Sequence, residues 1–110
     1  EPARIAAALA TIQGDPAPAT ALITGNVQTT IAVIRQLGAD FGTTALVGFD
    51  DFPLADILRP SLTVVAQGDA EIGRTAVDLF RARLANPARP VQTITVPTTL
   101  IVRGSGELMN

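Results

Sequence analysis

The sequence contains no cysteine, histidine or lysine, and its only aromatic residues are four phenylalanines. Without cysteine, the chain can form no disulfide, no thiol redox centre and no zinc–thiolate site. Without histidine, the Ser-His-Asp and Cys-His catalytic arrangements are excluded. Without lysine, Schiff-base chemistry and a P-loop are excluded as well. The composition therefore predicts a protein that is not an enzyme.

Positive charge is also scarce. All eight basic residues are arginine, and the net charge is −2. This charge does not supply the basic surface that nucleic-acid binding needs, nor a polybasic anchor for a membrane. No apolar run approaches the length of a transmembrane helix. The 110 residues suit one small domain, and the 47% hydrophobic content is enough to bury a core.

Short apolar runs alternate with helical patterns along the chain. Runs that predict buried strands lie at residues 21–23, 44–47 and 62–66, and two segments rich in β-branched residues lie at 92–96 and 98–103. Helical spacing predicts helices at 1–12, 27–37 and 70–84, and one or two helical turns at 53–58. In the third helix the expected buried stripe is Ile72, Ala76, Leu79, Phe80 and Leu84, and Asp69 is the expected cap. This order predicts an α/β fold, with helices packed on a parallel sheet in three layers.

Each of the first three predicted strands is followed by a polar residue. These residues are Asn26, Asp50 and Gln67. Ligands of open α/β sheets bind beyond the carboxyl ends of the strands, so the three side chains are candidates for one site. Carboxylate and amide groups suit a neutral ligand rich in hydroxyls, and Phe49 could lie against its apolar face. Simpler roles remain open: Asn26 as a helix cap, Asp50 as a turn residue and Phe49 as core.

Four segments together resemble the C-terminal part of the effector-binding domain of the lactose-repressor (LacI/GalR) family. They are Thr24-Gly25-Asn26, Val47-Gly48-Phe49-Asp50-Asp51, the region of Gln67 with the helix after it, and Val96 to Ser105 with its Arg103-Gly104-Ser105 ending. Their order and spacing are also similar, and they span most of residues 19–105. One position departs from the pattern, because Val27 stands where the family usually has aspartate.

The resemblance implies a type I periplasmic-binding-protein fold, with two lobes around a sugar cleft. It implies that Asn26 and Asp50 hydrogen-bond a small-molecule effector, that Gln67 lies near the crossover between lobes, and that no cofactor is needed. The parent protein would be a cytoplasmic repressor that binds DNA through a headpiece outside residues 1–110. The helix at 70–84 would pack on the other lobe.

The resemblance also implies a homodimer. The outer side of the helix at 27–37 and the apolar cluster Phe52, Leu54, Ile57 and Leu58 would face the partner, unless that cluster folds onto its own sheet. Two other functions stay open. A periplasmic sugar carrier would have the same fold, and a small enzyme could use carboxylates alone. Asp50-Asp51 is also placed like a magnesium phosphoacceptor site, but such a site needs the lysine that is absent.

Overall fold

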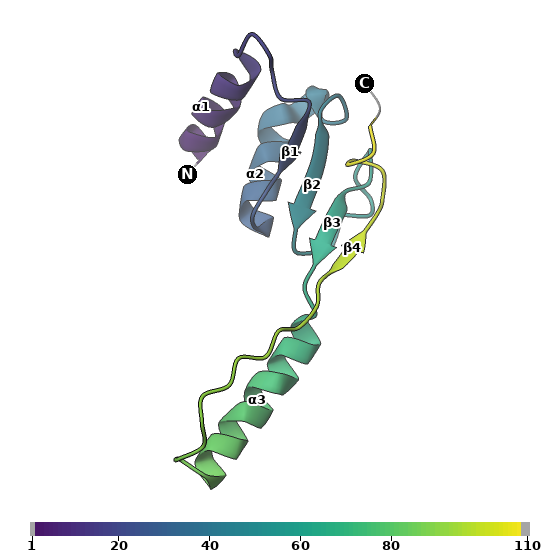
Figure 1. Cartoon of the computed structure of the whole chain (residues 1–110). Coiled ribbons are helices and arrows are strands. Elements are labelled where there is room, and N and C mark those ends of the chain that lie inside the picture. The colour runs from purple at the N-terminus through teal and green to yellow at the C-terminus, as the bar shows by residue number, and fades with distance from the viewer. Residues whose placement is uncertain (1, 109–110) are drawn as a thin grey trace. The chain divides into compact units, whose positions relative to one another are not determined.

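The computed structural model describes residues 2–108, which form two compact units (Figure 1). The first unit contains the described residues up to Ala66 and those from Leu100 onward. The second unit is Gln67–Thr99. The chain therefore leaves the first unit once and returns to it once.

Four strands form one sheet in the order β1 (Ala21–Ile23), β2 (Ala45–Phe49), β3 (Thr63–Ala66) and β4 (Thr99–Ile101). β1 pairs with β2 and β2 with β3, both in parallel. β4 lies next to β3, and its arrow points the opposite way in Figure 1. The predicted α/β fold is confirmed, and the sheet is parallel except at β4. The three parallel strands match the predicted runs to within two residues at each end.

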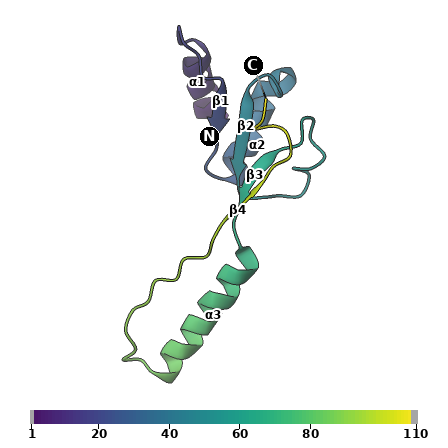
Figure 2. The same ribbon diagram turned by 45° about the vertical axis from the view of Figure 1, so that its right-hand side comes forward.

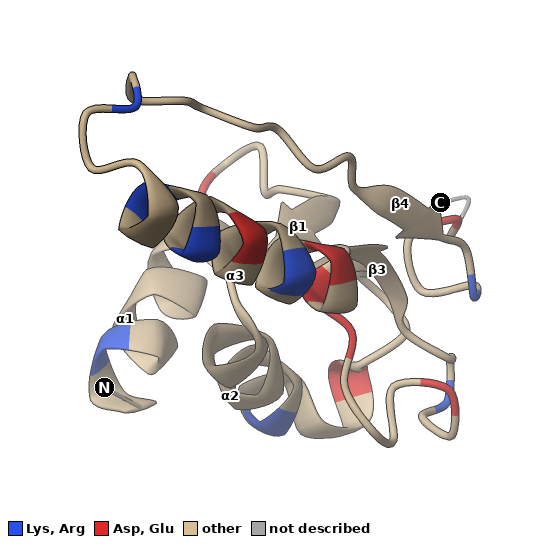
Figure 3. Cartoon of the chain, turned by 90° about the horizontal axis from the view of Figure 1, so that it is seen from below, with Lys and Arg blue, Asp and Glu red and all other residues tan. Residues whose placement is uncertain are grey.

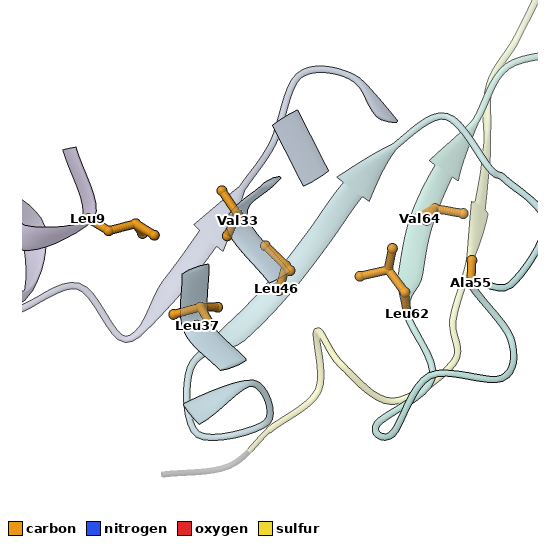
Figure 4. Close-up of a cluster of buried hydrophobic side chains, with 7 residues drawn as sticks. All are labelled: Leu9, Val33, Leu37, Leu46, Ala55, Leu62 and Val64. Atoms are coloured by element: carbon orange, nitrogen blue, oxygen red, sulfur yellow. The ribbon is translucent and has the colours of Figure 1, made fainter. Parts of the chain in front are cut away.

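The core of the first unit lies between the sheet and its helices. Helix α1 (Pro2–Gln13) packs against α2 (Val27–Leu37), and α2 packs against β2. A 3-10 turn, η1 (Gly38–Asp40), follows α2. A cluster of buried aliphatic side chains comes from both helices, the sheet and the loop before β3 (Figure 4); it consists of Leu9, Val33, Leu37, Leu46, Ala55, Leu62 and Val64. A core of Ala, Val and Leu follows from the shortage of aromatic residues.

Two glycines let backbone segments approach this sheet closely. A Cβ on Gly48 would lie 3.2–3.3 Å from side-chain atoms of Val64, Leu62 and Thr30, so β2 and α2 pack closely there. A Cβ on Gly106 would lie only 2.8 Å from a methyl group of Val47. The C-terminal segment therefore lies directly on β2.

The second unit consists of α3 (Asp69–Ala85) and an extended return segment (Figure 2). None of the 17 residues of α3 is buried, so the predicted buried stripe is wrong for this chain. Within its own unit, α3 has only the return segment to pack against. Charged residues of both signs lie along the helix (Figure 3). The cap position is Gly68, which makes Asp69 the first helical residue and corrects the expected cap.

Two further predictions fail. Residues 92–96 form no strand, because none of the described strands pairs with them. Of the predicted strand at 98–103, only residues 99–101 join the sheet. Residues 53–58 form turns rather than a helix. In that segment Leu54 has a φ of 87°, a value that L-residues with large side chains adopt rarely.

Candidate functional site

Asn26 and Asp50 follow neighbouring parallel strands. The Thr24 N–H donates to Val47 O at 3.0 Å, so the ladder between β1 and β2 continues to the end of β1. The Asp50 N–H donates to Val65 O at 2.9 Å, which extends the pairing of β2 with β3 in the same way. Both residues thus lie beyond the carboxyl edge of the sheet, where the strand directions predicted them.

The side chain of Asn26 caps α2. Its Oδ1 accepts a hydrogen bond from the Thr29 N–H at 2.8 Å, and its extended backbone is typical of a cap. The interpretation of Asn26 as a helix cap is therefore correct. The cap uses only the acceptor of the carboxamide, and the amide group carries two donor hydrogens of its own. Asn26 is exposed, so capping and ligand binding are compatible.

A buried pair of threonine hydroxyls holds this junction, and the sequence interpretation missed it. Thr24 Oγ1 and Thr30 Oγ1 lie 2.6 Å apart, and both residues are buried. Thr30 Oγ1 also lies 2.8 Å from Asn26 O, and Thr24 Oγ1 lies 3.4 Å from Val47 O. The sequence did contain a signal for this contact: Thr30 lies four residues after the cap Asn26, at the spacing that lets a threonine hydroxyl bond the cap carbonyl. These bonds fix Asn26 between β1 and α2.

Asp50 has a φ of 70°, in the left-handed region that aspartate tolerates better than most residues. It is half-buried. Phe49, the last residue of β2, is also half-buried and pairs with Val65. Gln67 is exposed and opens the second unit, so its convergence with Asn26 and Asp50 stays a prediction.

The next residue, Asp51, forms an ion pair with Arg103. Arg103 Nη1 and Nη2 each lie 2.7 Å from one carboxylate oxygen of Asp51, which is the forked geometry of a strong guanidinium–carboxylate pair. The hydrogen bond from Arg103 keeps the pKa of Asp51 below its ordinary value. The sequence interpretation treated Asp51 and Arg103 only as parts of two separate motifs. The structure shows that the two motifs bind each other.

Ser105, the last residue of the Arg-Gly-Ser ending, is buried in the sheet. Its Oγ donates to Leu46 O at 2.6 Å and accepts from the Thr63 N–H at 2.8 Å. The serine thus joins β2 to β3, and its contacts are entirely structural.

The four residues predicted for a dimer interface divide into two pairs. Phe52 and Leu58 are half-buried and pack against the core, as the alternative interpretation expected. Leu54 and Ile57 are 61% and 60% exposed. An apolar groove of about 290 Å³ lies between this segment and α2; its lining residues are Ile31, Ile34, Arg35, Phe52, Pro53, Leu54 and Leu58.

Within residues 2–108, no group of three or more acidic side chains is placed to hold a metal ion. None of the helices in this part of the chain is long and apolar enough to cross a membrane.

Comparison with known proteins places the chain in a family. Residues 2–106 match the family model of the periplasmic binding protein-like domain. The HTH-type transcriptional regulator PtxS of Pseudomonas aeruginosa is 37% identical over 90 residues, which are 77% of this chain and 26% of that protein. The chain thus spans about a quarter of the length of this curated relative.

A lactose operon repressor of Rhizobium radiobacter is 35% identical over 79 residues, which cover 71% of this chain and 69% of that protein. A LacI family transcriptional regulator from Enterococcus faecalis V583, solved with bound ribose, superposes with a TM-score of 0.77 at 24% identity; the match covers 96% of this chain and 40% of the other. The chain therefore belongs to the periplasmic binding protein-like domain family, and the relatives that it matches include transcriptional regulators.

Proposed function

We propose that this chain is the C-terminal part of the effector-binding domain of a LacI-type transcriptional repressor, and that Asn26 and Asp50 bind hydroxyl groups of a sugar. The observation that carries the proposal is the placement of an amide and a carboxylate after adjacent parallel strands, β1 and β2. The matched repressors and the ribose-bound neighbour support a sugar as the ligand class. We propose Phe49 and Gln67 as further ligand contacts.

The regulatory mechanism follows from differential binding. A sugar that contacts this chain and the remainder of the effector domain stabilises the closed arrangement of the two lobes over the open one. Because an effector shifts a conformational equilibrium only by its difference in affinity between states, this preference is the coupling to operator binding. Contact with DNA belongs to a part of the repressor outside this chain. The match to repressors favours this function over that of a periplasmic carrier.

Replacing Asp50 tests the ligand site. In an NMR titration of the chain with ribose and lactose, we expect weak, millimolar binding with amide shifts at Asn26 and Asp50. Asp50→Asn should weaken this binding about tenfold or more, since a hydrogen bond to a charged acceptor is worth about 1.5–3 kcal/mol. Asparagine tolerates the positive φ of this position, so the loop should keep its conformation.

The matched control is Asp40→Asn, which removes the same charge from the exposed η1 turn that precedes β2. It should bind the sugars as the unaltered chain does. The proposal fails if neither sugar moves the amides of Asn26 and Asp50, or if both variants lose binding equally.

We also propose that the groove between α2 and residues 52–58, together with Leu54 and Ile57, forms a homodimer interface. Two exposed aliphatic side chains beside an apolar groove support it. The positive φ of Leu54 supports it as well, because strained backbone at an exposed apolar residue is typical of binding segments.

The double variant Leu54→Asp, Ile57→Asp should raise the dimer dissociation constant about a hundredfold or more in sedimentation equilibrium, because charges would be buried without partners. Phe80→Asp is the matched control, since Phe80 on α3 is 62% exposed. The interface is assigned wrongly if the unaltered chain is a monomer, or if Phe80→Asp dissociates the dimer as strongly.

A further inference from the structure

Asp50, the residue proposed to bind the effector, has a backbone conformation that needs support from its surroundings. A φ of 70° is unfavourable for residues other than glycine, and aspartate adopts it only at some cost. On its N-terminal side the loop is held by β3, because the Asp50 N–H donates to Val65 O. A second anchor of the loop lies on its C-terminal side.

That anchor is Asp51. Its Oδ1 accepts the Phe52 N–H at 3.0 Å and a bond from Arg103 Nη1 at 2.7 Å, and its Oδ2 accepts from Nη2 at 2.7 Å. The carboxylate thereby connects the loop after β2 to the C-terminal segment. The side chains of Arg103 and Asp51 are 19% and 34% exposed, so water competes only in part with the pair.

Arg103 is itself held on the sheet. Its backbone N–H donates to Thr63 Oγ1 at 2.9 Å, and the Gly104 N–H reaches the same oxygen at 3.2 Å. Nη1 also lies 3.3 Å from Leu62 O. The adjacent Ser105 is buried between β2 and β3. The guanidinium therefore projects from a fixed part of the backbone.

From this arrangement we infer that Arg103 is a positioning residue of the effector site: through its forked pair with Asp51 it holds Asp50 in its left-handed conformation without touching the ligand. The inference rests on the proposed function of Asp50 as a sugar ligand. A forked guanidinium suits this role better than an ammonium group, because two parallel bonds fix orientation as well as distance.

Arg103→Gln tests the inference in the same ribose titration. We expect the variant to keep the dispersed amide spectrum of the folded sheet, whereas the amides of residues 50–52 shift and exchange faster with solvent. Ribose binding should weaken about tenfold, the effect of losing one well-placed hydrogen bond. Arg103→Lys should recover part of the loss, since it keeps the charge but not the fork.

Arg4→Gln on α1 is the matched control for charge, and it should change neither the amides of residues 50–52 nor the affinity for ribose. Asp51→Asn is a second variant, at the more exposed end of the pair. It should shift the amides of residues 50–52 and weaken ribose binding as Arg103→Gln does. It therefore provides the test if Arg103→Gln does not fold. Unchanged amides at residues 50–52 would overturn the inference.

The inference is also overturned if ribose binds the Arg103 variants normally while Asp50→Asn loses binding, and in that case the sugar site stands. If ribose binds no form of the chain, the proposed function fails, and the inference fails with it.

Discussion

Leu46→Ala is expected to lower the free energy of unfolding of the chain by about 2–5 kcal/mol. Leu46, the second residue of β2, is fully buried and belongs to the apolar cluster that joins α1, α2 and the sheet. Truncation removes buried methyl and methylene groups and leaves a cavity that the surrounding residues fill only in part. Aromatic side chains that could rotate into the space are few in this sequence.

The loss should be measured by urea unfolding followed by circular dichroism and NMR. Leu100→Ala provides the control, because Leu100 is 58% exposed and its truncation should change stability by about 0.5 kcal/mol or less. Equal effects of the two substitutions would show that the core of this unit is not centred on β2. A large change in the denaturant slope would instead indicate that unfolding is not a single transition.

The first unit was predictable from the sequence because local pattern and tertiary contact agree there. The runs at β1, β2 and β3 are apolar, each is followed by a helix or a turn signal, and each finds a parallel neighbour. Asn26 is both a strong cap residue and the cap that is observed. The placement of Asn26 and Asp50 follows from strand direction alone, so no side-chain detail was needed.

The second unit was predicted less well because the apolar pattern of α3 is not matched by burial in the described residues. Ile72, Phe80 and Leu84 recur at helical spacing, which indicates a buried face, yet all three are exposed. In the same way, residues 92–96 are rich in β-branched side chains, but none of the described strands pairs with them. Periodicity indicates that a helix has an apolar face, but it does not indicate what packs against that face.

The polar contacts between distant segments could not be predicted from the sequence, for a different reason. Asp51 with Arg103, and Ser105 with Leu46 and Thr63, are separated by 42–59 residues. No local spacing rule relates such positions. The resemblance identified both the Gly-Phe-Asp-Asp and the Arg-Gly-Ser segments, but only the folded backbone shows that each is completed by the other.

Ser105→Ala is expected to lower the free energy of unfolding by about 1–3 kcal/mol. The substitution creates almost no cavity, but it removes the hydroxyl that pairs with two buried backbone groups. The Thr63 N–H and Leu46 O would remain buried between β2 and β3, and a buried backbone group without a partner costs the desolvation that its hydrogen bond had offset.

Hydrogen exchange distinguishes this cause from a general loss of stability. The Thr63 amide should exchange faster in Ser105→Ala than the fall in global stability accounts for, because the amide loses its own acceptor. Ser61→Ala is the matched control: Ser61 Oγ donates to the carbonyl of exposed Asp56 at 2.7 Å, which water can replace, so the cost should be about 0.5 kcal/mol or less. If both serine variants are equally stable, the Ser105 hydroxyl does not join the two strands as described.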